Sequence, residues 1–187
     1  IIRRCPHHTF QILTKRPERI KDHLPGGWGQ GWHNVWLGTS IGSNKSIHRL
    51  SQLSLVNAKT KFLSLEPLHG SIDLRSVKVK IMDMDFFALS AIDWVIIGGE
   101  SGNEKGQYRY RKCKIEWIET LIHQCTISHI PVFVKQLGTY LAKELHLKDR
   151  HGRDIDEWPE HLRIREFPIL GKEKQGNIQS SNQTSKE

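Results

Sequence analysis

The sequence is poor in cysteine, and the three cysteines that it has are far apart. Cys5, Cys113 and Cys125 form no CxxC-type pair, so we expect no metal site held by this chain's own cysteines. An odd number of widely spaced cysteines is also more typical of reduced thiols than of a disulfide framework. We therefore predict a cytoplasmic protein without disulfide bonds.

Long hydrophobic runs are missing as well. No apolar run approaches the roughly 18 residues that a membrane-spanning helix needs, so we expect no membrane partner. The first residues, Ile1 to Arg4, lack the apolar core and the cleavage site of a signal peptide. The chain also begins without Met, which is the pattern of a fragment or a processed piece.

Acidic residues are fewer than basic ones. The 20 Asp and Glu against 28 Lys and Arg give a formal net charge of +8, and the basic residues are spread out rather than gathered in one block. Two interpretations stay open: a solvated basic surface, or contact with an anionic partner such as nucleic acid. The hydrophobic content of 37% is high enough for a globular domain.

Five apolar runs begin near residues 9, 34, 61, 94 and 131. Their spacing, about 25 to 37 residues, suits successive strand–helix units. We predict an α/β domain over residues 1–170 with five parallel strands in sequence order, helices outside and one open edge. A complete eight-stranded barrel needs about 250 residues, so the prediction is a partial (β/α) barrel, incomplete on its amino-terminal side. Residues 171–187 have almost no apolar side chains and are predicted to be a disordered, dispensable tail.

The connections are less regular than the strands. Apolar residues at helical spacing predict outer helices over residues 45–56, 112–128 and 140–145. A short helix is predicted over 18–23 after Pro17, and residues 72–89 are predicted to form an excursion over one end of the sheet. The glycine-rich loop that follows the short helix carries Trp28 and Trp32, which either cover the barrel edge or stack on a ligand.

The stretch over residues 93–102, DWVIIGGESG, organises the domain. Its unbroken apolar run is typical of a strand that is covered on both faces. Two glycines follow, where the backbone can turn sharply or approach a ligand closely. Glu100 and Ser101 then stand just past the carboxyl end of the strand, which is where parallel α/β folds place their sites.

Each of the five predicted strands ends in polar residues. Because parallel strands deliver these positions to one rim, we predict a shared site there. The residues concerned are Lys15, Arg16, Thr39, Ser40, Glu66, Glu100, Ser101, Lys135 and Gln136.

Opposite charges on one rim suit a zwitterionic or phosphorylated ligand. Glu66, Glu100 and Lys135 are the candidate catalytic residues, since carboxylates hold amines or act as bases. The candidate substrate-binding residues are Lys15, Arg16, Ser40, Ser101 and Gln136. Lys15 and Lys135 are expected to lower the pKa of the two carboxyl groups. The alternative is that these charges only neutralise one another as ion pairs.

Several motifs taken together resemble a phage protein family. They occur in the same order as in the phage Gp-thirty-seven/Gp-sixty-eight family, a family of unsettled function, and cover about residues 9 to 168. The motifs are 10–17 (FQILTKRP), 34–38 (NVWLG), 62–68 (FLSLEPL), 94–102 (WVIIGGESG), 133–138 (FVKQLG), 158–160 (WPE) and 165–168 (REFP).

The resemblance implies a relative of radical-SAM enzymes. Their partial barrels bind an iron–sulfur cluster and S-adenosylmethionine at the strand carboxyl ends, and Gly98-Gly99-Glu100 is similar to their GGE motif, so Gly98 and Gly99 are candidate cofactor-binding residues. Family members usually carry a cysteine-rich stretch before the first strand, and here Cys5 stands alone. Three thiolates are wanted for such a cluster, so neither cofactor is expected in this chain by itself, although both are expected in a full-length form.

Three functional hypotheses follow. The first is a fragment of a radical-SAM-like enzyme that acts on a small molecule or a nucleic acid. The second is a non-enzymatic module that binds nucleic acid or a phage partner through its basic surface. The third is a degenerate, inactive remnant.

Overall fold

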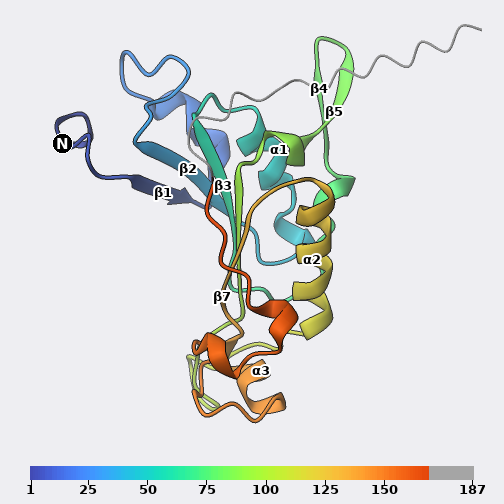
Figure 1. Ribbon diagram of the computed structural model, residues 1–187. Helices are drawn as coiled ribbons and strands as arrows, with labels where there is room; N and C mark the ends of the chain where they lie inside the picture. The colour runs from blue at the N-terminus through green and yellow to red at the C-terminus, as the bar shows by residue number, and fades with distance from the viewer. Residues whose placement is uncertain (169–187) are drawn as a thin grey trace, which may run out of the picture.

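Five parallel strands form the centre of the domain. The computed structural model describes residues 1–168. The strands are β1 (Phe10–Thr14), β2 (Val35–Ser40), β3 (Thr60–Leu65), β6 (Trp94–Gly98) and β7 (Val132–Gln136). They lie in the order β1-β2-β3-β6-β7, and every neighbouring pair is parallel. The predicted sequence order is confirmed, and all five carboxyl ends therefore face the same edge, near α3 (Gly138–Glu144) in Figure 1.

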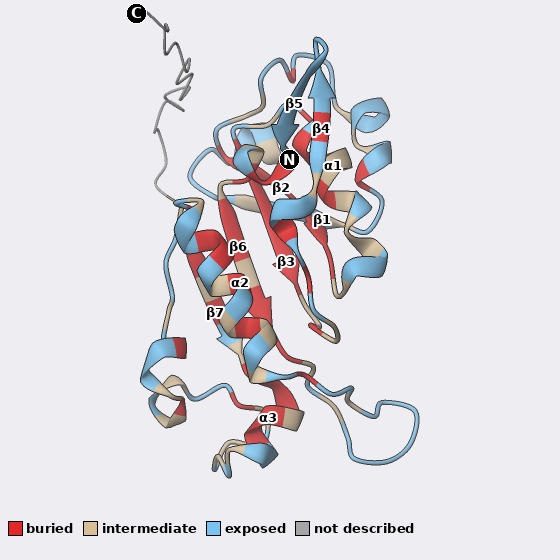
Figure 2. Ribbon diagram, turned by 90° about the vertical axis from the view of Figure 1, so that its right-hand side faces the viewer, coloured by how far each residue is buried: buried red, intermediate tan, exposed pale blue. Residues whose placement is uncertain are grey.

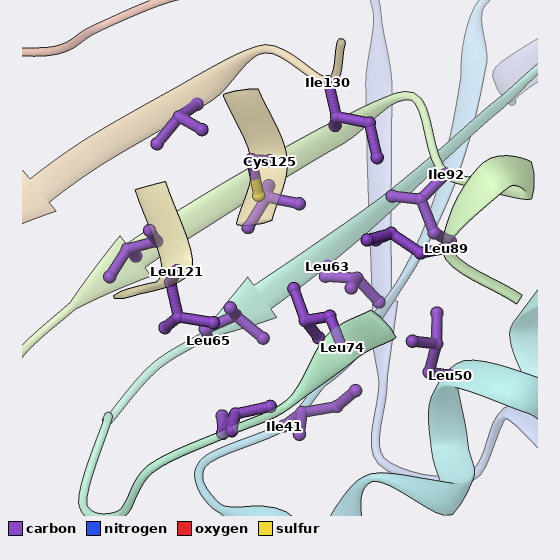
Figure 3. Packing of buried hydrophobic residues seen from close by; sticks show 14 of the residues in the cluster. Ile41, Leu50, Leu63, Leu65, Leu74, Leu89, Ile92, Leu121, Cys125 and Ile130 are labelled. Carbon is purple, nitrogen blue, oxygen red and sulfur yellow. The ribbon is translucent and has the colours of Figure 1, made fainter. Parts of the chain in front are cut away.

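Helices α1 (His48–Ser54) and α2 (Ile115–Ile127) cover one face of this sheet (Figure 1). Alternation along a strand sends every second side chain to that face, and Leu63 and Leu65 of β3 are fully buried there. Leu121 and Cys125, one helical turn apart on α2, pack against the same cluster (Figure 3). The main hydrophobic core thus lies between the sheet and this helix layer.

The opposite face of the sheet carries aromatic side chains. Trp94 of β6 lies at its centre, with ring centroids 5.7 Å from Trp36, 6.1 Å from Phe62 and 5.9 Å from Phe133. Phe167 stacks on Trp94 at 5.5 Å. Edge-to-face and offset contacts of this kind stabilise the fold by more than the burial of their apolar area alone would. The sheet is therefore apolar on both faces, as the unbroken apolar runs predicted.

The excursion between β3 and β6 contains an antiparallel hairpin of β4 (Lys78–Ile81) and β5 (Met84–Phe87). Met82 and Asp83 form its turn with φ of 47° and 63°, as a two-residue hairpin turn requires. The hairpin projects from the end of the molecule opposite α3 (Figures 1 and 2). It therefore stands away from the strand carboxyl ends.

The two short connections are less helical than predicted. The predicted helix over 18–23 is a pair of 3-10 turns, Pro17–Arg19 and Lys21–His23, which is the form that short helical connectors often take. The predicted helix over 45–56 is α-helical only within α1. Ser51 and Ser54 each donate a side-chain hydrogen bond to a carbonyl three residues earlier, and such bonds compete with the helical backbone.

The sheet does not close into a barrel within residues 1–168. At the β7 edge, the chain returns as a short segment in which Arg165 bridges Phe133. The structure therefore supports an α/β fold with a five-stranded parallel sheet.

None of its helices within the described range is long and apolar enough to cross a membrane. The predicted tail, residues 171–187, lies outside the described residues.

Candidate functional site at the strand carboxyl ends

An ion pair between Glu66 and Lys135 crosses the rim. Glu66 directly follows β3 and Lys135 lies in β7, and β6 runs between these two strands. Their charged groups nevertheless lie 3.3 Å apart, Lys135 Nζ to Glu66 Oε2. A Cβ atom at Gly98 of β6 would overlap the Glu66 carboxylate. The missing side chain at Gly98 is therefore what lets the two charges meet across the middle strand.

The second predicted carboxylate, Glu100, is held by Arg111. Arg111 Nε donates to Glu100 Oε2 at 2.8 Å and Arg111 Nη2 donates to Oε1 at 2.9 Å. The backbone N–H of Arg111 also donates to Oε2. These hydrogen bonds hold the pKa of Glu100 below its usual value. The pKa is thus lowered by Arg111, and the prediction that Lys15 and Lys135 would lower it is wrong for Glu100.

His69 belongs to the same rim and was not predicted from the sequence. Its backbone N–H donates to the Gly42 carbonyl at 3.0 Å. Its pKa is lowered, first by burial and then by the positive charge of Arg111, while Glu100 opposes this shift. The imidazole is therefore neutral at neutral pH and able to accept a proton. Its position three residues after Glu66, in the loop that follows β3, is a signal that could have identified it.

Gln136, Ser101 and Gly99 form a small polar network beside these charges. Gln136 Nε2 donates to Ser101 Oγ at 2.8 Å and to the Gly99 carbonyl at 2.9 Å. A Cβ at Gly99 would overlap the carbonyl oxygen of Leu137. The predicted residues Ser101 and Gln136 are therefore in direct contact, and both glycines of the predicted GGE motif have a packing reason to be glycine.

The remaining predicted residues lie apart from these contacts. Within residues 1–168, no ion pair joins Lys15 to Glu66 or Glu100, and its strand, β1, is two strands away from β3. Arg16 lines a groove on the helix-covered face instead. Ser40 is buried, and its carbonyl accepts a hydrogen bond from Arg49 at 2.8 Å. The structure thus brings together the predicted residues at the carboxyl ends of β3, β6 and β7, whereas Lys15, Arg16 and Ser40 take part in none of the rim contacts described above.

Comparison with known proteins identifies a family and leaves the activity open. Residues 1–168 match the family described as "Protein of unknown function (DUF5131)". The chain belongs to the DUF5131 family. No curated protein and no solved structure matches it. For this DUF5131 chain, the geometry of the rim is therefore the basis of any functional proposal.

The cysteines of this DUF5131 chain do not suit an iron–sulfur cluster. Cys113 and Cys125 are buried, and burial raises the pKa of each thiol to about 12, so neither is a ready thiolate. Cys5 is partly exposed. No group of three His, Cys, Asp or Glu side chains within the described range is placed to hold a metal ion.

The Glu100–Arg111 pair predicts a pH-dependent contribution to stability. Because the folded pKa of Glu100 is below the unfolded one, its contribution is complete above the unfolded pKa, about 4.3, and is lost as the pH falls through the folded value. Glu100→Gln should cost about 1 kcal/mol at pH 7, since Arg111 is half-exposed, and less at pH 3. Urea unfolding at both values measures this. In an Arg111→Gln background the pH dependence of the difference should disappear; its persistence would contradict the assignment.

Proposed function

We propose that the rim binds the amino-acid end of a zwitterionic small molecule of the S-adenosylmethionine type, and that the chain is part of a radical-SAM-like enzyme related to the phage Gp-thirty-seven/Gp-sixty-eight family. One observation carries the proposal: the Glu66–Lys135 pair, which spans β6 over Gly98 at the strand carboxyl ends. Ligands of open parallel sheets bind at this edge.

The pair matches the chemistry of an α-amino acid group. Such a group carries an ammonium and a carboxylate a few ångströms apart, and Glu66 and Lys135 offer one charge of each sign at a similar separation. Lys135 is 56% exposed, whereas Glu66 is 17% exposed. Lys135 is thus free to turn toward a ligand carboxylate while the more buried Glu66 stays in place to receive the ammonium.

The neighbouring groups supply the rest of the site. Glu100 is fixed by two contacts with the Arg111 guanidinium, which leaves it oriented but largely neutralised. His69, neutral and next to this pair, is the group best suited to take a proton from a bound molecule. We assign Glu66 and Lys135 to ligand binding, His69 to proton transfer, and Glu100 with Arg111 to holding the rim in shape.

The architecture supports the relation to radical-SAM enzymes, although the cysteines do not. Five parallel strands in sequence order, with helices on one face, are what an opened (β/α) barrel would contain. The three cysteines do not fit an iron–sulfur cluster, so a cluster in a longer form would need other cysteines. We therefore assign no step of a reaction to a cluster in this chain.

Calorimetric titration with two related ligands tests the proposal. S-adenosylmethionine has the amino-acid end, and 5′-methylthioadenosine lacks it. The chain should bind S-adenosylmethionine at least about tenfold more tightly than 5′-methylthioadenosine. Glu66→Gln and Lys135→Met should each remove most of this preference, because each deletes one charge of the complementary pair.

The matched control is Glu119→Gln. Glu119 lies on α2 and pairs with His161, so the same chemical change there should leave both affinities unaltered. Equal binding of the two ligands by the unmodified chain, or a preference that survives Glu66→Gln, would overturn the proposal.

A nucleic-acid partner is the alternative that the net charge of +8 favours. It predicts retention of single-stranded RNA or DNA that weakens steeply with salt. Such retention should not depend on Glu66, since an acidic group does not attract phosphate. Strong, salt-dependent retention without any S-adenosylmethionine binding would favour this alternative.

A further inference from the structure

The outer edge of β1 is unprotected within residues 1–168. β1 pairs with β2 only. Phe10 N–H donates to the Asn34 carbonyl at 2.8 Å, and since backbone groups alternate in direction along a strand, those of Gln11 and Leu13 point away from the sheet. Ile12 and Leu13, on opposite faces, are 43% and 49% exposed. Proteins usually cover or charge an apolar edge of this kind.

A groove of about 390 Å³ adjoins this edge. Ile12 lines it together with Leu37, its register partner on β2. Leu37 belongs to the core on the helix-covered face, so the groove lies on that side of the sheet, bordered by the two 3-10 turns that follow β1. Trp28 and Trp32, 5.4 Å apart, form another wall. From the sequence, Trp28 and Trp32 could either cover the barrel edge or stack on a ligand. In the structure both line one apolar groove.

The charged side chains that line this apolar groove are all basic. Arg16, Arg19 and His23 line it, and the residues that line it include no Asp or Glu. Arg19 Nη2 lies 3.3 Å from His23 Nε2, which places these two side chains together. An occupant with an apolar face and flanking carboxylates would complement both the walls and the charge.

We propose that β1 and this groove together dock a strand–helix segment of a partner polypeptide, whose strand extends the sheet and whose amphipathic helix carries acidic residues toward Arg16 and Arg19. A small anionic molecule in the groove would cover Ile12 but leave Leu13 and the outward backbone groups exposed. A second copy related by a two-fold axis would bring the same cations together. A strand joined to an acidic helix would pair with the free edge of β1, fill the apolar groove and neutralise the charges of Arg16 and Arg19.

The docking surface is independent of the proposed ligand site. It lies at the β1 edge, whereas the Glu66–Lys135 pair belongs to β3 and β7. Failure of one proposal therefore leaves the other standing.

A synthetic peptide tests the docking proposal. It joins a Val- and Thr-rich strand as long as β1 to a Leu- and Glu-containing amphipathic helix of about 15 residues, long enough to be helical. Binding, measured by calorimetry, should slow hydrogen exchange at the Gln11 and Leu13 amides. Ile12→Lys and Arg19→Glu should each weaken it about tenfold or more, and a peptide with Lys in place of Glu should bind the Arg19→Glu variant better than the unmodified chain.

The control variant is Ile127→Lys on α2, since Ile127 is 45% exposed, much like Ile12; it should bind the peptide normally. The proposal is overturned if the peptide in large excess does not bind, or if it binds without protecting Gln11 and Leu13. It is also overturned if the small anion 1-anilinonaphthalene-8-sulfonate binds in an Arg19-dependent way while the peptide does not, because the groove would then be a small-molecule site.

Discussion

Gly138→Ala should lower the free energy of unfolding by about 3 kcal/mol. Gly138, at the start of α3, has φ of +83°, where a side chain costs about 1–2 kcal/mol. A Cβ there would also lie 2.6 Å from the Gly99 carbonyl carbon and 2.7 Å from the Glu100 backbone nitrogen, and such overpacking costs about 1–3 kcal/mol. Urea unfolding measures the loss, which corresponds to a melting temperature lower by about 6–12 °C.

The control separates the two causes of this loss. Gly106 has nearly the same φ, +85°, but nothing lies within 4 Å of its added Cβ. Gly106→Ala should therefore cost only about 1 kcal/mol, the backbone strain alone. Because the Gly138 contact lies against Glu100, Gly138→Ala should also disturb the rim. Equal losses for the two variants would show that the close approach of β6 and α3 contributes nothing.

Lys61→Met should destabilise the domain by about 2–3 kcal/mol. Lys61, within β3, is buried, and its ammonium donates to the carbonyls of Ser54 at 2.9 Å and Val56 at 3.0 Å, at the end of α1. Met keeps most of the side-chain volume but leaves these carbonyls without that donor, and each buried unsatisfied group costs about 1–3 kcal/mol. Chemical unfolding at neutral pH measures the change.

Lys59→Met is the matched control for this prediction. Lys59 is exposed two residues earlier in the chain, so the same substitution there should change stability by no more than about 0.5 kcal/mol. An unchanged or higher stability of Lys61→Met would mean that the desolvation of the buried ammonium outweighs its hydrogen bonds.

The strands of this fold were predictable because burial leaves a direct trace in the sequence. Residues 94–97, WVII, form an unbroken apolar run because β6 packs against helices on one face and aromatic rings on the other. The parallel order followed from the spacing of such runs. The antiparallel hairpin was not predicted, since its side chains are mostly exposed and give no clean alternation.

The contacts of the rim were predictable only in part. That Glu66 and Lys135 share an edge follows from parallel strands, but that they touch depends on which strand separates them and on Gly98 within it. The contact between Glu100 and Arg111 depends on how the loop over residues 101–110 folds back, and no periodicity encodes that path. Such details follow from tertiary packing rather than from local pattern.

The alternation of side chains along a strand explains why the adjacent residues Lys15 and Arg16 lie on opposite sides of the sheet. Lys15 and Arg16 are adjacent in sequence, and both were assigned to the rim. Ile12 and Arg16 both line the groove on the helix-covered side of the sheet. They are four residues apart, which is twice the two-residue repeat of a strand, so Arg16 lies on the same side as Ile12 and opposite to Leu13. The burial of Lys61 was also not predictable from the sequence, because a lysine within an apolar strand gives no sign of being buried.

We propose that the rim between β3 and β7 binds a zwitterionic ligand of the S-adenosylmethionine type. Titrating the isotope-labelled chain with S-adenosylmethionine and following amide chemical shifts tests this binding most directly. The largest shifts should fall at Glu66, Gly98, Gly99 and Lys135, and they should be lost in Glu66→Gln. Shifts confined to another part of the chain, such as the groove beside β1, or no shifts with the ligand in large excess, would contradict it.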